Sequence, residues 1–353
     1  MVRERNEKLR VPPPPPRLRP GPGWREPDGR LGGPSGRGPR PRRRRPAGRT
    51  SNLVASSVVI LGMLAVCLCV VLVSTWLLPL PGDGGRVNVL LLGIDRRKGD
   101  GWTYRTDTIM ILTLDPETRQ AGLLSIPRDL QLAIPGHGQD RINTANVFGY
   151  LHDYPGGGPA LLEATIDVNF DIPIDGYVMI DFVAFEEIVD TLGGVEIEVT
   201  ETLHDTRYPD PRPGDPHAYK TVHFDPGWQH MDGRRALAYA RSRMSTSDFD
   251  RARRQQEIVL ALRDKVLSLK AIPRWPALAK ILREAVQTDI GTGEILGLAR
   301  LASRIDLADL ERVVIEAPLV YGHRRADGAA VQLPDWGRID PVIYGLFGPP
   351  ETR

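Results

Sequence analysis

The longest uncharged stretch of the sequence constrains this chain more than any other feature. No Asp, Glu, Lys or Arg occurs from Thr50 to Gly82, and the 28 residues Leu53–Leu80 read LVASSVVILGMLAVCLCVVLVSTWLLPL. A helix needs about 20 apolar residues to span a bilayer, whereas the apolar core of a signal peptide has about 7 to 15. A buried core helix is the alternative, which the length and purity of the run disfavour. We therefore predict a transmembrane signal-anchor helix over residues 53–80.

The charge on the two sides of this run predicts its orientation. Residues 1–50 carry 15 Lys or Arg and 4 Asp or Glu, a net charge of +11, and the remaining residues carry 31 and 40, a net charge of −9. Basic residues beside a membrane span mark its cytoplasmic side. We predict a single pass through the cytoplasmic membrane, with the N-terminus in the cytoplasm and residues 83–353 outside it.

The N-terminal tail has the composition of a segment without a core. Residues 1–50 contain 12 prolines and few large apolar side chains, so we predict that this tail is disordered. Its arginines are expected to set topology and attract anionic lipids, and nucleic acid is not expected as a partner. Both cysteines, Cys67 and Cys69, lie in the apolar run. Residues 83–353 therefore have no disulfide and depend on core burial, for which the segment is long enough.

Apolar runs and helical patterns alternate along residues 83–353. This alternation predicts an α/β fold, a three-layer α/β/α domain with a central mixed sheet and helices on both faces. The segment 201–226 is polar and rich in proline, and we expect a flexible excursion there. Strands are expected at about 86–95, 108–114, 120–126, 176–180, 193–199 and 312–318, and helices at about 143–150, 160–168, 182–192, 233–240, 248–269, 276–287 and 293–303.

Charged residues flank the ends of the first three expected strands. Asp95 follows the first strand, and Arg128 and Asp129 follow the third in the sequence SIPRD. Arg105 and Asp107 precede the second strand and, being two residues apart in extended chain, point the same way. Polar residues at the carboxyl ends of buried strands commonly line a site. Any single one of these residues could instead form an ion pair or cap a turn. That alternative explains the whole set less well than a shared site does.

The segment Ala240–Gln256 reads ARSRMSTSDFDRARRQQ and carries five arginines. At 100° per residue, a helix from Asp248 places Arg251 and Gln255 in line with the apolar stripe of Ile258, Val259, Leu262, Val266 and Leu269. Arg253 and Arg254 fall off that stripe, toward water or a rim. A guanidinium aimed inward needs an anionic partner, because burying an unpaired charge is costly. Asp248 is one candidate for that partner and a bound phosphate is another.

The residue types indicate the ligand. Carboxylates without a histidine cluster favour a hard cation such as Mg²⁺ (or Mn²⁺), which binds one or two carboxylates and phosphate oxygens. Arginines present forked donors to such oxygens, so the set suits a pyrophosphate. The sequence has no GxxxxGK loop, no GxGxxG after the first strand, no HExxH and no GxSxG. The seven histidines are scattered, which disfavours zinc.

Several ordered motifs resemble those of the LytR-CpsA-Psr family, over about Asn88 to Leu269. They are NVLLLGID, RTD with Arg105 and Asp107, LLSIPRD, RINTAN, VDTLGGVEI and DFDRARRQQ. The resemblance implies a membrane-anchored enzyme that transfers a glycan phosphate, such as teichoic acid or capsular polysaccharide, from a polyprenyl-pyrophosphate carrier to peptidoglycan. About 80 C-terminal residues match less clearly.

The resemblance also implies roles for individual residues. Asp95 and Asp107 match metal-binding positions, and Asp248 is expected to orient the arginine helix. Arg141 stands where members of the family usually carry lysine, so its role in binding substrate is less defined. The positions expected around the pyrophosphate are Arg105, Arg128, Arg241, Arg243, Arg251 and Gln255.

The implied reaction leaves alternatives open. A wall-sugar hydroxyl would attack the phosphorus nearer the glycan and polyprenyl phosphate would leave, with Asp129 as the candidate base on sequence grounds alone. The carrier tail requires an apolar tunnel, expected between the sheet and the helices. Alternatives are a binding or regulatory membrane protein that holds a lipid-linked glycan without turnover, and a hydrolase in which water replaces the sugar hydroxyl.

Overall fold

A computed structural model describes residues 85–96, 103–210, 215, 218–243, 247–305 and 310–348. The predicted tail and the apolar run Leu53–Leu80 lie outside these residues. Within the described part of the chain, no helix is both long and apolar enough to cross a membrane. The predictions of a disordered tail and a signal anchor therefore remain predictions.

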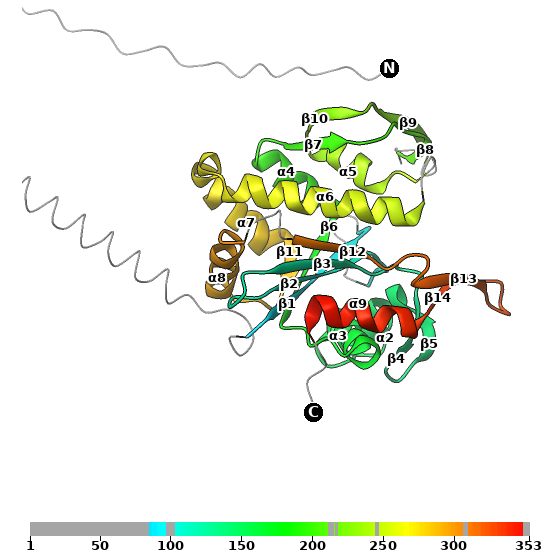
Figure 1. The fold of residues 1–353 in the computed structure, drawn as a ribbon. Coiled ribbons are helices and arrows are strands. Elements are labelled where there is room, and N and C mark those ends of the chain that lie inside the picture. The colour runs from blue at the N-terminus through cyan, green and yellow to red at the C-terminus, as the bar shows by residue number, and fades with distance from the viewer. Residues whose placement is uncertain are drawn as a thin grey trace, which may run out of the picture. The chain divides into compact units, whose positions relative to one another are not determined.

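A six-stranded mixed sheet forms the centre of the domain, in the order β11-β6-β1-β2-β3-β12 (Figure 1). Strand β1 (Val87–Ile94) is antiparallel to β2 (Thr106–Leu114) and parallel to β6 (Gly176–Asp181). Strand β3 (Ala121–Ser125) is antiparallel to β2 and parallel to β12 (Leu310–Val314). The edge strand β11 (Val286–Thr288) is antiparallel to β6. The predicted mixed sheet is thus confirmed.

Alternation along the central strands sends apolar side chains to both faces of the sheet. Leu90, Leu92 and Ile94 belong to the largest core cluster, together with residues of α3 (Gly157–Phe170) and α9 (Trp336–Phe347). The opposite face is covered by α4 (Phe182–Thr191), α5 (Gly233–Arg241) and α6 (Asp248–Leu267), as Figure 1 shows. Because both faces are covered, the strands are nearly continuous apolar runs, as the sequence predicted.

The remaining elements surround this core. They are β4 (Gln131–Ile134), β5 (Gly138–Arg141), the 3-10 helix η1 (Ile142–Thr144), α2 (Ala145–Leu151), β7 (Val195–Val199), β8 (Leu203–Pro209), β9 (Tyr219–Phe224), β10 (Gly227–Met231), the 3-10 helix η2 (Leu269–Arg274), α7 (Trp275–Ala285), α8 (Thr292–Ala302), β13 (Val320–Arg324) and β14 (Ala330–Pro334).

The expectation of a flexible excursion over residues 201–226 was wrong for the part that the structure describes. Strands β8 and β9 pair antiparallel, with Leu203 opposite Phe224 and Tyr208 opposite Lys220. Leu203, Tyr208 and Phe224 are buried in the core cluster that also contains α5 residues. A few large side chains at spaced positions therefore anchor a segment whose overall composition is polar.

Two predictions for the arginine helix were also wrong. Arg254 is buried because this face of α6 packs on α5, where its guanidinium donates to the carbonyls of Tyr239 and Ser242 at 3.0 and 2.5 Å. Leu269, expected on the buried stripe, is 82% exposed because α6 ends at Leu267 and the 3-10 turn changes the phase. Arg253 is exposed as predicted and pairs with Asp250 and Glu316.

Candidate active site

Carboxylates from three neighbouring strands meet at one end of the sheet. The register pairs Ile94 with Thr106 and with Asp181, so β1 and β6 end where β2 begins. An irregularity in the β1–β2 ladder falls between Gly93 and Ile94. Asp95 and Asp107 follow Ile94 and Thr106 directly, and this places both predicted carboxylates at the same end of the sheet.

Arg128, in the loop after β3, connects this end of the sheet with its surroundings. Its Nη1 donates to Oδ1 of Asp107 at 2.5 Å, and its Nε lies 3.7 Å from Oδ2 of Asp129. Arg141, at the end of β5, places its Nε 3.4 Å from Oδ1 of Asp129. Two arginines therefore flank the carboxylate that the sequence suggested as a base.

The first turn of α6 brings a further set of charges to the same place. Ser247 caps the helix in a capping box with Asp250, which fixes the position of Asp248 in the first turn. The carboxylate of Asp248 lies 3.6 Å from Arg128, 3.7 Å from Arg243 and 3.3 Å from Arg251. One carboxylate thus holds three arginines together, and Asp248, one of the two partners considered for Arg251, does pair with it.

Arg251 is a buried cation whose ion-pair partner is Asp248. Its side chain is 7% exposed, and burial lowers its pKa to about 10, with Asp248 opposing and Arg243 and Arg128 reinforcing that shift. The guanidinium still carries its charge at neutral pH. A buried charge near other arginines is stabilised further by any anion that enters the site.

Burial also lowers the pKa of Arg128, but attraction by Asp107 and the hydrogen bond to it outweigh burial, so the net shift is upward. The Nε atoms of Arg128, Arg141 and Arg251 are buried and lack a hydrogen-bond acceptor among the described residues. Buried donors are normally satisfied, and an unmade hydrogen bond there costs about 1–3 kcal/mol. Phosphate oxygens would provide acceptors for these three donors.

Arg241, the last residue of α5, extends the charged group toward β1. Its Nη2 lies 3.3 Å from Oδ2 of Asp95, and its guanidinium carbon lies 3.9 Å from the ring centre of Phe182 and 5.7 Å from that of Tyr208. Stacking against rings fixes the plane of the guanidinium while leaving its N–H groups available.

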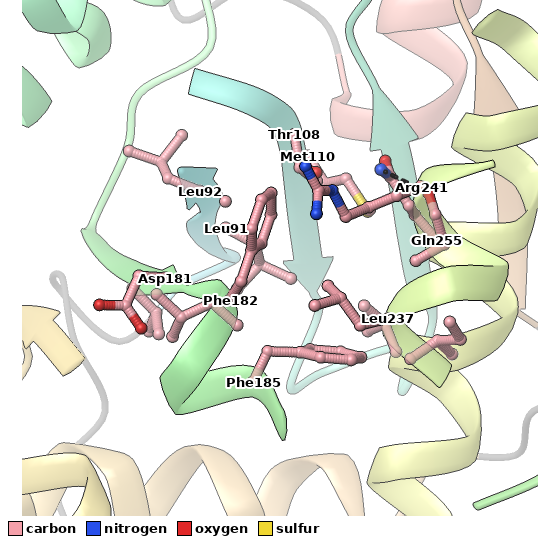
Figure 2. Close-up of a pocket in the computed structure, with 16 residues that line it drawn as sticks. Leu91, Leu92, Thr108, Met110, Asp181, Phe182, Phe185, Leu237, Arg241 and Gln255 are labelled. Carbon is pink, nitrogen blue, oxygen red and sulfur yellow. Dashed lines mark hydrogen bonds between the residues drawn. The ribbon is translucent and has the colours of Figure 1, made fainter. Parts of the chain in front are cut away.

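An apolar cavity of about 220 Å³ lies between the sheet and helices α4 to α6. Figure 2 shows Arg241, Gln255 and Thr108 close together on one side of it, and Phe182, Phe185 and Leu237 along its wall. A smaller hollow of about 20 Å³, lined by Asp107, Arg128 and Arg251, shares Thr108 and Gln255 with the cavity. The cavity is thus an apolar space that adjoins a cationic one, where the sequence led us to expect a tunnel.

The other predicted residues differ in how closely they join the cluster. Arg105 is exposed and has no ion-pair partner in the described part of the chain. Arg243 is 44% exposed and reaches Asp248 only at 3.7 Å. Gln255 is half-buried and donates to the carbonyl of Ala240 at 3.3 Å while lining the cavity.

Sequence reasoning missed several residues of the site. Asp181 is buried at the end of β6. Its carboxylate caps α4, and its Oδ2 lies 2.6 Å from Nη2 of Arg96 in an ion pair. The rule that selected Asp95, a polar residue at the carboxyl end of a buried strand, would have selected Asp181 as well. Phe182 and Tyr208 stack on Arg241, and no sequence signal distinguishes them from core aromatics.

The two strand-end carboxylates suit a hard cation. Asp95 is 54% exposed and Asp107 31%, and Asp107 lines the hollow. The described residues contain no group of three or more His, Cys, Asp or Glu that could hold a metal by themselves. Mg²⁺ commonly binds one or two carboxylates and takes its other ligands from phosphate oxygens and water. The donor set therefore fits Mg²⁺ bound together with a phosphate ligand.

Curated proteins of two kinds, a named transferase and a named regulatory protein, are similar to this chain in sequence. The curated TagU of Oceanobacillus iheyensis, named polyisoprenyl-teichoic acid–peptidoglycan teichoic acid transferase, is 34% identical over 206 residues, which are 58% of this chain and 59% of the relative. MsrR of Staphylococcus aureus, named a regulatory protein, is 33% identical over 215 residues, 60% of this chain and 58% of the relative. The match thus spans about three fifths of the length of these relatives.

Solved structures share the fold over a larger part of the chain. A structure titled TagT bound to LIIa-WTA superposes with a TM-score of 0.59 at 27% identity, and the match covers 76% of this chain and 94% of that one. The sequence profile of the LytR_cpsA_psr family matches residues 79–344. This profile covers most of the chain, including the C-terminal part that the motifs alone left undecided. The chain belongs to the LytR-CpsA-Psr family.

Proposed function

We propose that this protein is a phosphotransferase that moves a glycan phosphate from a polyprenyl-pyrophosphate carrier to peptidoglycan. One observation carries the proposal: an apolar cavity of about 220 Å³ adjoins a hollow lined by Arg128, Arg251 and Asp107. A ligand with an isoprenoid tail and a pyrophosphate head matches both parts of that space. The names of the relative TagU and of the structure of TagT bound to LIIa-WTA support a lipid-linked glycan as the substrate class.

We further propose that the domain works outside the cytoplasmic membrane, held by the apolar run 53–80. This anchoring rests on the length of the run and on the charge difference across it. It is consistent with a substrate whose carrier resides in a bilayer.

In the proposed reaction, individual side chains have separate roles. An acceptor hydroxyl oxygen forms a bond to the phosphorus nearer the glycan, and the bond from that phosphorus to the bridging oxygen breaks, releasing polyprenyl phosphate. Arg128, Arg251 and Arg241 offer N–H donors to the pyrophosphate oxygens, where charge increases on the leaving group. Asp248 keeps Arg128 and Arg251 in place at 3.6 and 3.3 Å.

Asp95 and Asp107 would hold Mg²⁺ or Mn²⁺, which when bound neutralises charge on the phosphates. Asp129 is the proposed acceptor of the hydroxyl proton, since its carboxylate is 30% exposed at the rim of the cluster, between Arg128 and Arg141. Arg105 and Arg243, both exposed, are placed to meet the glycan or the acceptor rather than the buried phosphate.

The proposal is tested by incubating the full-length protein in detergent micelles with glycan-loaded polyprenyl pyrophosphate, Mg²⁺ and peptidoglycan fragments. Mass spectrometry should detect a phosphodiester between glycan and peptidoglycan together with released polyprenyl phosphate. Free glycan phosphate without linkage would instead support hydrolysis. Stable binding of the carrier with no product would support a binding or regulatory protein. An Arg128→Ala variant serves as the control for enzyme-dependent product.

A further inference from the structure

The turn after α6 exposes a row of large apolar side chains. Leu269 is 82% exposed, Ile272 47% and Trp275 47%. Residues three apart in a 3-10 helix lie on the same face, so η2 aligns Leu269 with Ile272, and Trp275, three residues further on, begins α7. On the opposite side of the turn, Ala271 is buried with Leu278 of α7. The exposed row is therefore not the core-packing side of this segment, which we call the α6–α7 corner (residues 269–276).

The charge of the α6–α7 corner together with α7 differs from that of the chain after the N-terminal tail. Residues 269–285 carry four basic residues and one acidic residue, a net charge of +3, whereas residues 51–353 carry a net charge of −9. The basic residues are Lys270, Arg274, Lys280 and Arg283. Leu, Ile and Trp side chains interleaved with Lys and Arg are typical of segments that lie in the interface of an anionic bilayer.

The start of the domain limits which of its sides can face a bilayer. Only four residues lie between Leu80, the end of the apolar run, and Gly85, so the five Cα–Cα steps of the connection span at most about 18 Å. Strand β1 begins beside α8, with Val87 and Val89 packed against Ile290, Ile295 and Leu298. Figure 1 shows α7 and α8 next to each other at the end of the domain where α6 finishes. A bilayer crossed by residues 53–80 would therefore lie near this end.

The charged site lies at the other end of α6. Leu267, the end of the helix, lies sixteen positions after Arg251, which corresponds to about 24 Å along the axis. Ile258 and Val259 line the apolar cavity between these points. An apolar contact with lipid at the corner would thus place the cavity between the bilayer and the cationic cluster.

We propose that the α6–α7 corner rests in the headgroup region of an anionic bilayer, with Leu269, Ile272 and Trp275 inserted and Lys270 beside lipid phosphates. This inference rests on the proposed membrane anchoring and deepens the proposed function, because it orients the carrier cavity relative to the membrane that supplies the carrier. Among the other exposed aromatic residues, Trp228 is 70% exposed but lies opposite Glu198 in the β7–β10 pair. An anionic surface would repel that position, which makes it a matched control.

The test uses full-length protein in nanodiscs, with Cys67→Ala and Cys69→Ala and a nitroxide attached to an Ile272→Cys variant. Power-saturation EPR then compares collisions of the label with oxygen, which concentrates in lipid, and with a water-soluble nickel chelate. In phosphatidylglycerol nanodiscs the oxygen-to-nickel ratio is expected to be several-fold higher than for a label on a Trp228→Cys variant. Phosphatidylcholine nanodiscs, or Lys270→Glu with Lys280→Glu, should reduce the difference.

Equal ratios at the two labelled positions in phosphatidylglycerol would overturn the inference. So would spin–spin broadening that disappears on dilution with unlabelled protein, because a second copy of the chain would then cover the corner. No carrier or acceptor is present in this measurement, so its outcome is separate from that of the transfer assay. All substituted residues outside the apolar run are exposed, so loss of folding is not expected to intervene.

Discussion

The guanidinium of Arg128 lies 2.5 Å from the carboxylate of Asp107, and this contact ties the loop after β3 to the start of β2. The same guanidinium lies 3.6 Å from Asp248 in the first turn of α6. The side chain of Arg128 therefore links the loop after β3 and the start of β2 to helix α6, which covers the sheet. Removing it should disturb ligand binding more than the fold, because its side chain stays 20% exposed at the hollow.

Arg128→Ala is expected to reduce the rate of glycan transfer by about 10²- to 10³-fold, the usual effect of removing a donor to developing charge. Arg128→Lys should recover only part of this loss, because lysine keeps the charge without the forked donors. Initial rates from mass spectrometry, with melting temperatures as the control for folding, measure both. Transfer at the wild-type rate in Arg128→Ala would remove this arginine from the mechanism.

Arg251 and Arg254, three residues apart on α6, should respond in opposite ways to replacement by methionine. Arg251→Met is expected to weaken binding of inorganic pyrophosphate at least about tenfold without lowering the melting temperature, because it removes a buried charge that other arginines repel. Calorimetric titration and thermal unfolding provide the two readouts. Unchanged pyrophosphate affinity would show that Arg251 has a structural role alone.

Arg254→Met should instead lower the melting temperature and leave pyrophosphate affinity intact. Its guanidinium satisfies the buried carbonyls of Tyr239 and Ser242. Leaving such groups without partners costs about 1–3 kcal/mol each. If this variant lost affinity while keeping its stability, the division of α6 into a ligand face and a structural face would be wrong.

The burial of Arg251 could be predicted from the sequence, whereas the burial of Arg254 could not. Helical phase placed Arg251 inward because Ile258 and Val259 continue its stripe, but it placed Arg254 off that stripe, toward water or a rim. The error arose because α6 packs on the sheet and on α5 at once, so more than one of its faces is buried. A single stripe calculated from periodicity cannot show the second contact, which depends on tertiary packing.

At the site, too, the strand ends could be predicted from local patterns, whereas the cavity could not. Three apolar runs predicted β1, β2 and β3, and Asp95 and Asp107 were correctly expected at one end of the sheet. The stacking of Phe182 on Arg241 and the size of the cavity depend on the spacing between layers. That spacing is set by many side chains together, so no local pattern in the sequence reports it.

The proposed metal dependence can be examined with Asp95→Asn and Asp107→Asn. Chelation of divalent cations should stop transfer by the wild-type protein, and Mg²⁺ or Mn²⁺ should restore it. Each amide variant is expected to need a higher Mg²⁺ concentration for half-maximal rate, because an amide is a weaker ligand than a carboxylate. A transfer rate that is insensitive to chelators would contradict the assignment of these carboxylates.

Filling the apolar cavity should separate recognition of the tail from chemistry at the head. Leu237→Trp places a larger side chain in the cavity wall and is expected to raise KM about tenfold for a long polyprenyl carrier. A short-chain carrier, which does not fill the cavity, should be used at nearly the wild-type rate. Equal effects on the two carriers would mean that the tail binds elsewhere.

Glu163, on α3, should make stability depend on pH far from the site. Burial raises the pKa of its carboxyl to about 7, the nearby Asp289 adds to the shift, and Oε1 has no hydrogen-bond partner within the described residues. The folded protein thus holds a proton that the unfolded chain releases above about pH 4.5, so stability falls as pH rises toward 7. Glu163→Gln should raise the melting temperature by about 2–4 °C at pH 8 and not at pH 4. Parallel pH profiles for the two proteins would refute this.

The central claim is that the arginine cluster and the apolar cavity form one site for a lipid pyrophosphate. A crystal structure of the protein with a polyprenyl pyrophosphate and Mg²⁺ tests it most directly. The pyrophosphate is predicted to accept hydrogen bonds from Arg128 and Arg251, and the isoprenoid chain to lie between Leu91, Leu237 and Val259. A pyrophosphate bound away from both arginines, or a tail that leaves the cavity empty, would contradict it.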